Sequence, residues 1–447
     1  MTHKHHTRPL HILMFGWEYP PLHAGGLGVA CQGLVQGLQK NGVKVTLVLP
    51  MDLQNHPEAH MLRGPANLAN HRHTRGTEET SFRFVQSSLQ PYDGFAEYAQ
   101  RMSTAASGGV FSTHTQGVPV VSSNANLYGP DLGEAVWRYA EQSVAITQDL
   151  HPDAIHCHDW MTYEAGIRAA HYHHVPLIMH IHATEYDRTQ GHPNAWIVEQ
   201  ERNGFLLADR IVAVSNFTKN MLVQHYGINP HKISVVYNGH DHTVDVQKKV
   251  APSPRSHQAD AVSHTQKKHR PIVLFLGRMT TQKNPTMFLD VAKLVVAVQP
   301  HVQFVMAGDG GMLTELVEYA CAIGLNDHII FTGKVSKNEA EELYRQADCF
   351  VMPSVSEPFG LVALEAIAQG TPVILSRQSG AAEVIDHAFK VDFWDKDKMA
   401  DCILTVLREK PLAEQLQSEA KGILKRLSWK NQASEVASLY THVLSSH

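Results

Sequence analysis

The sequence predicts an α/β protein with two doubly wound parallel-sheet domains. Short apolar runs at residues 11–15 and 44–49 indicate buried strands, and they flank a helix that ends near Lys40. A second strand–helix–strand pattern lies at residues 349–375. Residues 240–270, between these patterns, are rich in Lys, Ser, Gln and His and lack apolar periodicity, which is typical of a linker.

The composition excludes several classes of function. The chain has 447 residues, of which 43% are apolar and 18% are charged, as in ordinary globular proteins. A formal charge of -5 argues against a nucleic-acid partner. No run of about eighteen apolar residues exists, so neither a membrane-spanning helix nor a membrane partner is expected. The N-terminus carries no signal-peptide pattern, and five scattered cysteines suit free thiols, so we expect a cytoplasmic location.

Further strands and helices are expected in the N-terminal half. Residues 52–117 are polar and irregular and should form loops and short edge strands. A helix is expected at 135–150, and Ser215 and Asn216 should cap another that runs to Tyr226. The remaining apolar runs predict strands at 118–121, 154–160, 177–182, 210–214 and 233–237.

The C-terminal half repeats this alternation. In the pattern at 349–375, Pro358 stands where a helix can begin, and Gly370 and Pro372 mark its end. Ser428 is expected to cap a final helix. The apolar runs and helical spacings before them predict strands at 272–277, 302–307 and 329–332 and helices at 314–324 and 339–347.

The helix that follows the strand at 349–352 has the residues of a candidate phosphate and sugar site. Its first amides, on Phe359, Gly360 and Leu361, would point toward an anion, which the helix dipole also favours. Glu357 precedes the helix, and Glu365 lies about two turns inside it. Carboxylates so near a phosphate site would bind hydroxyls rather than phosphate oxygens, and sugar hydroxyls are the natural partner.

This set of residues resembles the E-x7-E signature of retaining glycosyltransferases with the GT-B fold. More narrowly, it is similar to glycosyltransferase family 4 and the related glycogen and starch synthases. The resemblance implies that Glu357 contacts the transferred sugar and that Glu365 binds the ribose hydroxyls. It also implies that the amides between them hold the sugar and the distal phosphate.

The resemblance extends to two cations and a turn in the same half of the chain. Arg278 and Lys283 are similar to the R-x4-K diphosphate clamp of the family, in which a planar fork and a point charge neutralise the leaving group. In the family, the turn that corresponds to Gly333, Lys334 and Val335 meets the nucleotide base. The donor-binding candidates here also include two glycines that follow strands, Gly277 and Gly308.

Three segments of the N-terminal half resemble the glycogen synthase pattern. Gly25, Gly26 and Leu27 correspond to the K-x-G-G-L loop, with His23 in place of the lysine. The H-x-H-D-W segment implies that Asp159 faces the active cleft. The H-x-x-E-x-D-R stretch implies that His182 contacts the donor sugar.

Two patterns raise the question of a metal. His156 and His158 alternate along one strand and share a face, but a metal site would need a third ligand, and none is apparent in the sequence. The triplet Asp395-Lys396-Asp397 could belong to a metal-dependent transferase of the other major fold. It precedes a helix, however, so a capping turn is the better interpretation. We therefore expect no metal and no cofactor.

The family implies the domain roles. Residues 1–240 would form the acceptor-side domain, onto which a helix at 428–447 packs back. Residues 241–270 would be the linker, and residues 271–427 would bind the nucleotide sugar.

The predicted function is retaining transfer of glucose from UDP-glucose or ADP-glucose to an α-1,4-glucan. His23 and Lys334 depart from the residues that the family's ADP-glucose enzymes carry, which favours UDP-glucose or mixed use. Another acceptor, such as a small metabolite, a sugar phosphate or a lipid, is the first alternative. A non-catalytic nucleotide-sugar-binding protein and an epimerase on the same fold are the others.

Overall fold

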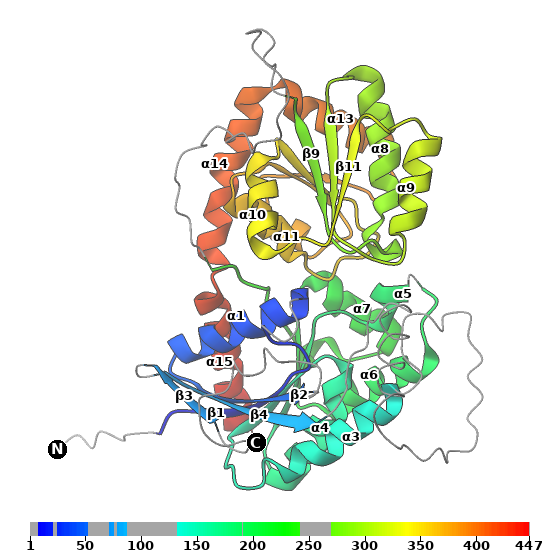
Figure 1. Ribbon diagram of the computed structural model, residues 1–447. Coiled ribbons are helices and arrows are strands. Elements are labelled where there is room, and N and C mark those ends of the chain that lie inside the picture. The colour runs from blue at the N-terminus through cyan, green and yellow to red at the C-terminus, as the bar shows by residue number, and fades with distance from the viewer. Residues whose placement is uncertain are drawn as a thin grey trace, which may run out of the picture. The chain divides into compact units, whose positions relative to one another are not determined.

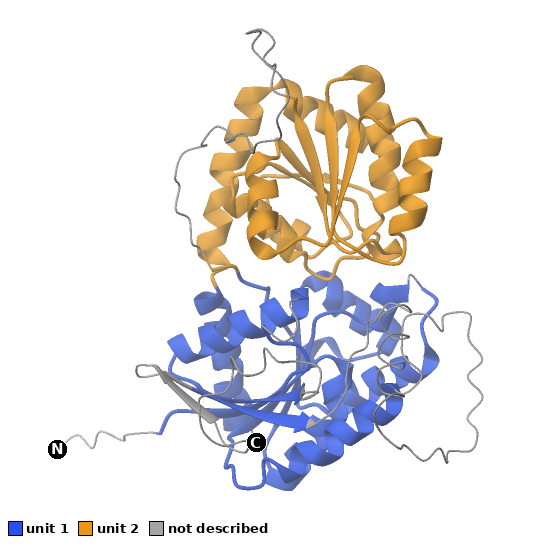
Figure 2. Ribbon diagram, in the orientation of Figure 1, with its two compact units in different colours: residues 1–239, 429–447 blue, residues 240–428 orange. Residues whose placement is uncertain are grey.

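The chain forms two compact units, residues 1–239 with 429–447 and residues 240–428 (Figure 2). The structure is a computed structural model. It describes residues 8–20, 25–51, 71–75, 78–86, 132–189, 191–241 and 270–446. The predicted strand at 118–121 and most of the predicted linker lie outside these ranges.

The first unit is built on a sheet with the order β3-β4-β2-β1-β5-β6-β7-β8. Every neighbouring pair is parallel except β3 and β4, which are antiparallel. The sequence predicted loops and short edge strands in this region, whereas β4 has nine residues and pairs with both β3 and β2. The strands are β1 (His11–Phe15), β2 (Lys44–Met51), β3 (His71–Arg75), β4 (Glu78–Gln86), β5 (Ala154–His158), β6 (Leu177–Ile181), β7 (Arg210–Ala213) and β8 (Ile233–Val235).

Helices cover both faces of this sheet (Figure 1). One face packs against helices that close the main apolar core: α3 (Leu132–Ala145), α4 (Tyr163–His173) and α6 (Ala195–Leu207). The remaining elements of this unit are the 3₁₀ turns η2 (Trp160–Thr162) and η3 (Pro230–Lys232) and the helices α5 (Glu185–Thr189) and α7 (Asn216–Tyr226).

The other face carries α1 (Gly26–Lys40) and the final helix, α15 (Trp429–Ser446), which pack together. A Cβ on Gly33 would lie 2.1 Å from Cε2 of Trp429, and one on Gly37 would lie 2.4 Å from its carbonyl oxygen. The two glycines therefore let α15, which comes from the end of the chain, approach the backbone of α1 closely.

The second unit is a six-stranded, fully parallel sheet with the order β11-β10-β9-β12-β13-β14. Its strands are β9 (Ile272–Leu276), β10 (Gln303–Ala307), β11 (Ile329–Gly333), β12 (Cys349–Met352), β13 (Val373–Ser376) and β14 (Phe389–Val391). The strands in its centre are almost wholly apolar and buried, as expected of a parallel sheet that is covered on both faces.

Helices on both sides enclose this second sheet (Figure 1). The helices on one side are α8 (Pro285–Val298), α9 (Leu313–Ala322) and α13 (Lys396–Arg408), and those on the other are α10 (Lys337–Gln346), α11 (Leu361–Ala368), α12 (Ala381–Val384) and α14 (Lys410–Arg426). A 3₁₀ turn, η4 (Thr281–Lys283), follows β9. No helix in the described part of the chain is both long and apolar enough to span a membrane.

Most expected elements are present, with three informative differences at their ends. β5 ends at His158 rather than residue 160, because Asp159 adopts a φ of 58° that interrupts the strand. α11 begins at Leu361 and not at Pro358, because Gly360 has a φ of 103° that no α-helix accommodates. The helix expected at 135–150 is α3, which begins three residues earlier, at Leu132, and ends at Ala145.

The capping interpretation of the Asp395 triplet is confirmed. The Asp395 side chain accepts a hydrogen bond of 3.0 Å from the backbone N–H of Lys398, so this aspartate is the N-cap of α13. Ser215 caps α7 in the same way, as predicted.

Candidate active site

The candidate residues of the second unit lie where its strand order reverses. The chain crosses from β9 to one side and later returns to place β12 on the other, so the loops after β9 and β12 flank a topological switch point. Ligands of doubly wound sheets bind at the carboxyl ends of such strands. Arg278 and Lys283 follow β9, and Glu357 follows β12.

Lys283 and Glu357 form an ion pair across this switch point. Lys283 Nζ contacts Glu357 Oε2, and the two side chains are only 19% and 8% exposed. Ser354 Oγ donates a hydrogen bond of 3.3 Å to the same carboxylate oxygen. The sequence assigned Lys283 to a diphosphate and Glu357 to a sugar, whereas the structure shows that the two side chains contact each other.

Hydrogen bonds from a side chain and from the backbone connect the two loops that carry this pair. Gln282 Nε2 donates to the carbonyl of Ser356 at 3.0 Å, and the N–H of Val355 donates to the carbonyl of Gln282 at 3.0 Å. The backbone of Glu357 is held on the far side by Gln378 and Gly380, at 2.9 Å each. The ion pair therefore stands on a rigid base rather than on mobile loops.

The backbone at the start of α11 requires glycine at position 360. A Cβ on Gly360 would lie 3.0 Å from the Met352 side chain and 3.2 Å from Glu357 Cγ, besides requiring a positive φ. The first amides of a helix have no acceptor four residues earlier within it, so the start of α11 has the partial positive charge of a helix N-terminus. This geometry suits an anion, as the sequence predicted from Phe359, Gly360 and Leu361.

Glu365 lies on α11 and is held by α10. Tyr344 Oη donates a hydrogen bond of 3.2 Å to Glu365 Oε2. Burial raises the pKa of Glu365, and the Tyr344 hydrogen bond partly opposes that rise. Sequence reasoning missed Tyr344, because no local pattern links it to a residue 21 positions further along the chain.

The two candidate glycines, Gly277 and Gly308, touch each other at the ends of β9 and β10. A Cβ on Gly308, whose φ is 132°, would lie 1.9 Å from the Gly277 carbonyl oxygen. The N–H of Gly308 donates to the Gly333 carbonyl at 2.9 Å, which brings the end of β11 alongside. Lys334 and Val335 follow Gly333 on this same edge of the sheet, and Lys334 is exposed.

In the first unit, both carboxylate oxygens of Asp159 accept hydrogen bonds from other residues of the protein. Its Oδ1 accepts the backbone N–H of His182 at 2.7 Å, and its Oδ2 accepts Arg188 Nη2 at 3.1 Å. Burial raises the pKa of Asp159 to about 6, although Arg188 and the backbone donors favour the charged form. Its carboxylate thus positions the loop that carries His182.

Arg188 and Glu201 extend this network, and the sequence did not single them out. Arg188 Nη1 lies 3.7 Å from Glu201 Oε1, and Tyr226 Oη donates to Glu201 Oε2. The N–H of Glu185 donates to Glu201 Oε1 at 2.9 Å. Burial raises the pKa of Glu201 to about 8. The signal that could have found Arg188 is its place at the end of the H-x-x-E-x-D-R stretch that begins at His182.

His182 is held by a second histidine. Its Nε2 lies 2.9 Å from His158 Nδ1, and its Nδ1 has no hydrogen-bond partner among the described residues. Burial, followed by the neighbouring His158, lowers the pKa of His182 well below its usual value. The side chain is therefore a neutral imidazole in a fixed orientation.

The glycine loop of the first unit also has a carboxylate that sequence reasoning missed. Glu18 Oε2 accepts the backbone N–H of Gly28 at 2.9 Å, inside the first turn of α1. A Cβ on Gly25 would lie 2.8 Å from that carboxylate. Gly25 and Gly26 are exposed and Leu27 is half-buried, while His23 lies outside the described residues.

Comparison with protein families accounts for both units. Residues 24–244 match the profile described as Glycosyltransferase Family 4, and residues 257–422 match the profile described as Glycosyl transferases group 1. The chain belongs to the family 4 glycosyltransferases. The resemblance predicted from the sequence is thereby confirmed.

This family 4 glycosyltransferase has relatives along nearly its whole length. It is 28% identical over 438 residues to an uncharacterized glycosyltransferase of Methanocaldococcus jannaschii, covering 96% of this chain and 97% of that protein. It is 25% identical over 451 residues to a glycogen synthase of Mycobacterium tuberculosis, covering 96% and 94%.

Solved structures confirm the GT-B fold of this glycosyltransferase. Sucrose-phosphate synthase from Thermosynechococcus elongatus aligns with a TM-score of 0.69 at 17% identity, covering 98% of this chain and all of that chain. Anabaena HepE in complex with UDP and glucose aligns with a TM-score of 0.65 at 16% identity, covering 97% and 100%.

Proposed function

We propose that this glycosyltransferase acts with retention and moves glucose from a nucleotide-glucose donor to an α-1,4-glucan, as a glycogen synthase does. The observation that carries the proposal is the Lys283–Glu357 ion pair beside the start of α11, at the switch point of the second unit. A cation, a helix N-terminus and a carboxylate then lie in one cluster of loops.

The charges suit a diphosphate leaving group. Lys283 is a point charge held on a fixed loop, Arg278 precedes it on the same connection after β9, and α11 adds its first-turn amides. Donors fixed before the reaction stabilise developing negative charge without reorganising, which is usually the largest electrostatic contribution to catalysis. In this proposal the second unit binds the nucleotide sugar, and the first unit lies on the acceptor side.

The carboxylates suit the hydroxyls of the donor. Glu357 would accept hydroxyls of the transferred sugar, and Glu365, oriented by Tyr344, would accept those of the ribose. The Gly277–Gly308 contact and the turn at Lys334 and Val335 would receive the rest of the nucleotide. The family resemblance gives His182 the role of a contact to the donor sugar, and Asp159 holds the loop of His182.

The reaction we propose is displacement on one face of the sugar. The bond from the anomeric carbon to the diphosphate oxygen breaks, and a bond from that carbon to the acceptor hydroxyl oxygen forms. The departing diphosphate takes the acceptor's proton. Arg278 and Lys283 stabilise the charge on the diphosphate as the bond breaks. The rival is a double displacement through a carboxylate nucleophile, which would form a covalent glucosyl-enzyme.

The donor base and the acceptor rest on the relatives. HepE was solved with UDP and glucose, and one full-length relative is a glycogen synthase. An exposed Lys334 offers no aromatic ring for a purine to stack on, which favours UDP-glucose over ADP-glucose. Sucrose-phosphate synthase shares the fold with a different product, so sugar phosphates are the main competing acceptors.

A screen of nucleotide sugars tests the proposal. Release of nucleotide from UDP-glucose, ADP-glucose and a set of other sugar nucleotides is measured with and without glycogen and with fructose 6-phosphate. We expect the fastest release with UDP-glucose, and a rise in rate when glycogen is added. Release that only a sugar phosphate stimulates would assign another acceptor, and no release from any donor would refute catalysis by this site.

A further inference from the structure

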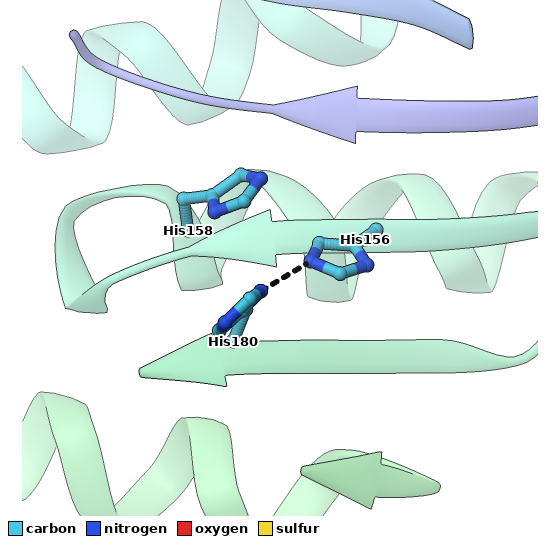
Figure 3. Close-up of side chains that lie close together, drawn as sticks. All are labelled: His156, His158 and His180. Carbon is cyan, nitrogen blue, oxygen red and sulfur yellow. Dashed lines mark hydrogen bonds between the residues drawn. The ribbon is translucent and has the colours of Figure 1, made fainter. Parts of the chain in front are cut away.

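Buried histidines gather in the first unit, on the sheet face opposite the main apolar core. The parallel register of β5 and β6 places His158 directly opposite His180. Because alternate residues share a face, His156 and His158 on β5 and His180 on β6 all project to the same side (Figure 3). None of the three is more than 4% exposed.

These three side chains have the arrangement of a metal site. One ring nitrogen of each lies within 4.8 Å of the other two. His156 Nε2 and His180 Nδ1 are 3.2 Å apart, as the dashed line in Figure 3 shows. The sequence left His156 and His158 without a third candidate ligand, and the strand register supplies it.

Two ring nitrogens of the cluster lack a hydrogen-bond partner among the described residues. His158 Nε2 and His180 Nε2 are buried and have no hydrogen-bond partner among the residues that the structure describes. Buried polar atoms of this kind call for an explanation, such as an ion.

A second shell is already in place. Tyr440 Oη lies 2.6 Å from His156 Nδ1, and His182 Nε2 lies 2.9 Å from His158 Nδ1. In metal sites the non-ligating ring nitrogen almost always makes such a hydrogen bond, which fixes the tautomer and the orientation of the ring. Tyr440 comes from α15, so the cluster joins two neighbouring strands to the final helix of the chain.

We propose that His156, His158 and His180 bind one divalent transition-metal ion, of which Zn²⁺ is the first candidate, with the fourth tetrahedral position left to a water molecule. Imidazole ligands suit Zn²⁺, Co²⁺, Ni²⁺ and Cu²⁺ and do not suit Mg²⁺ or Ca²⁺. Ligand nitrogens of a tetrahedral zinc site lie about 3.3 Å apart, so small ring rotations close the present triangle. The site adjoins His182, which the proposed function assigns to the donor sugar, but metal binding by the three histidines does not depend on that function.

The amount of zinc that the protein retains tests this proposed site directly. Full-length protein without an affinity tag, with His3, His5 and His6 replaced by Ala to remove competing imidazoles, is stripped with chelator and loaded with excess Zn²⁺. After gel filtration we expect about one equivalent of zinc per chain. Loading with Co²⁺ should give the visible absorption of a tetrahedral site. If this protein retains no zinc after loading and shows no cobalt band, the proposal is overturned.

Matched variants locate the ion. His180→Asn should retain less than about a tenth of an equivalent, whereas His171→Asn, at an exposed position on α4, should retain as much as wild type. Tyr440→Phe leaves the ligands and should weaken zinc binding by about tenfold or more. Circular dichroism checks that each variant is folded. Equal zinc in His180→Asn and wild type would overturn the assignment. If His180→Asn does not fold, unchanged zinc affinity in Tyr440→Phe would do so.

Discussion

Lys283 Nζ and Glu357 Oε2 form an ion pair between the loops that follow the two central strands of the second unit. The pair joins residues 74 positions apart in sequence. It places the cation proposed for the leaving group beside the carboxylate proposed for the sugar. A bound donor would therefore meet both charges at one point, between its diphosphate and its glucose.

Removal of either clamp cation should cripple turnover. We expect Lys283→Ala and Arg278→Ala each to lower kcat by at least about a hundredfold, or about 2.7 kcal/mol, because each removes positive charge from the leaving diphosphate. Steady-state kinetics with the preferred donor measure this. Lys293→Ala, at an exposed position on α8, is the matched control and should retain full activity. Full activity in both clamp variants would refute the assignment.

The two glutamates should have separable effects. Glu357→Gln should abolish most transfer while the free nucleotide still binds, because its contact is with the sugar. Glu365→Gln should chiefly weaken nucleotide binding, since the ribose loses a carboxylate acceptor. Calorimetric titration with the nucleotide, alongside kcat, distinguishes the two. The reverse pattern would mean that their roles are exchanged.

Gly308 should tolerate no side chain. Its Cβ would lie 1.9 Å from the Gly277 carbonyl oxygen, and its φ of 132° disfavours any L-residue. Gly308→Ala should therefore lower the free energy of unfolding by about 3 kcal/mol, as measured by urea denaturation. Gly311→Ala is the control, because its Cβ would meet no atom within 4 Å, and the change should stay within about 0.5 kcal/mol. Equal effects would contradict this packing.

His11 should make stability depend on pH. Burial, followed by Lys44, lowers its pKa from 6.5 to about 4, and its Nε2 lies 2.9 Å from Thr46 Oγ1. Because the folded pKa lies below the unfolded one, the stabilisation is complete above pH 6.5 and is lost as the pH falls toward 4. The unfolded chain binds the extra proton in that window.

His11→Gln cannot titrate but can still form a hydrogen bond to Thr46. As the pH falls from 6.5 to 4, the unfolding free energy of the wild type should therefore decrease relative to that of the variant by up to about 1.4 kcal/mol per pH unit. Urea denaturation across this range measures it. A difference that stays constant with pH would show that His11 is not held neutral.

The sequence predicted what depends on local pattern. Apolar runs and glycine positions predicted most strands of both sheets but not β14, nor the positions of β3 and β4. Ser215 and Asp395 were correctly interpreted as caps. The start of α11 was misplaced, because Gly360 has a φ of 103° and a helix cannot continue through such a residue. Local periodicity contains no information of that kind.

Contacts between distant segments could not be predicted in this way. The Lys283–Glu357 pair, the hold of Arg188 on Asp159 and the Tyr344 contact with Glu365 each join different elements. The histidine cluster could be predicted from the sequence only in part. Alternation placed His156 and His158 on one face, but their meeting with His180 depends on the register of β5 against β6.

Incorporation of labelled glucose into glycogen tests the central claim most directly. The wild-type protein is incubated with UDP-[¹⁴C]glucose and glycogen, and the polymer is precipitated, counted and digested with an α-1,4-specific amylase. We predict label in the polymer that the amylase releases, with at least about a hundredfold less label from Lys283→Ala. Absence of label in the polymer, or label in a linkage that the amylase does not cleave, would contradict the account.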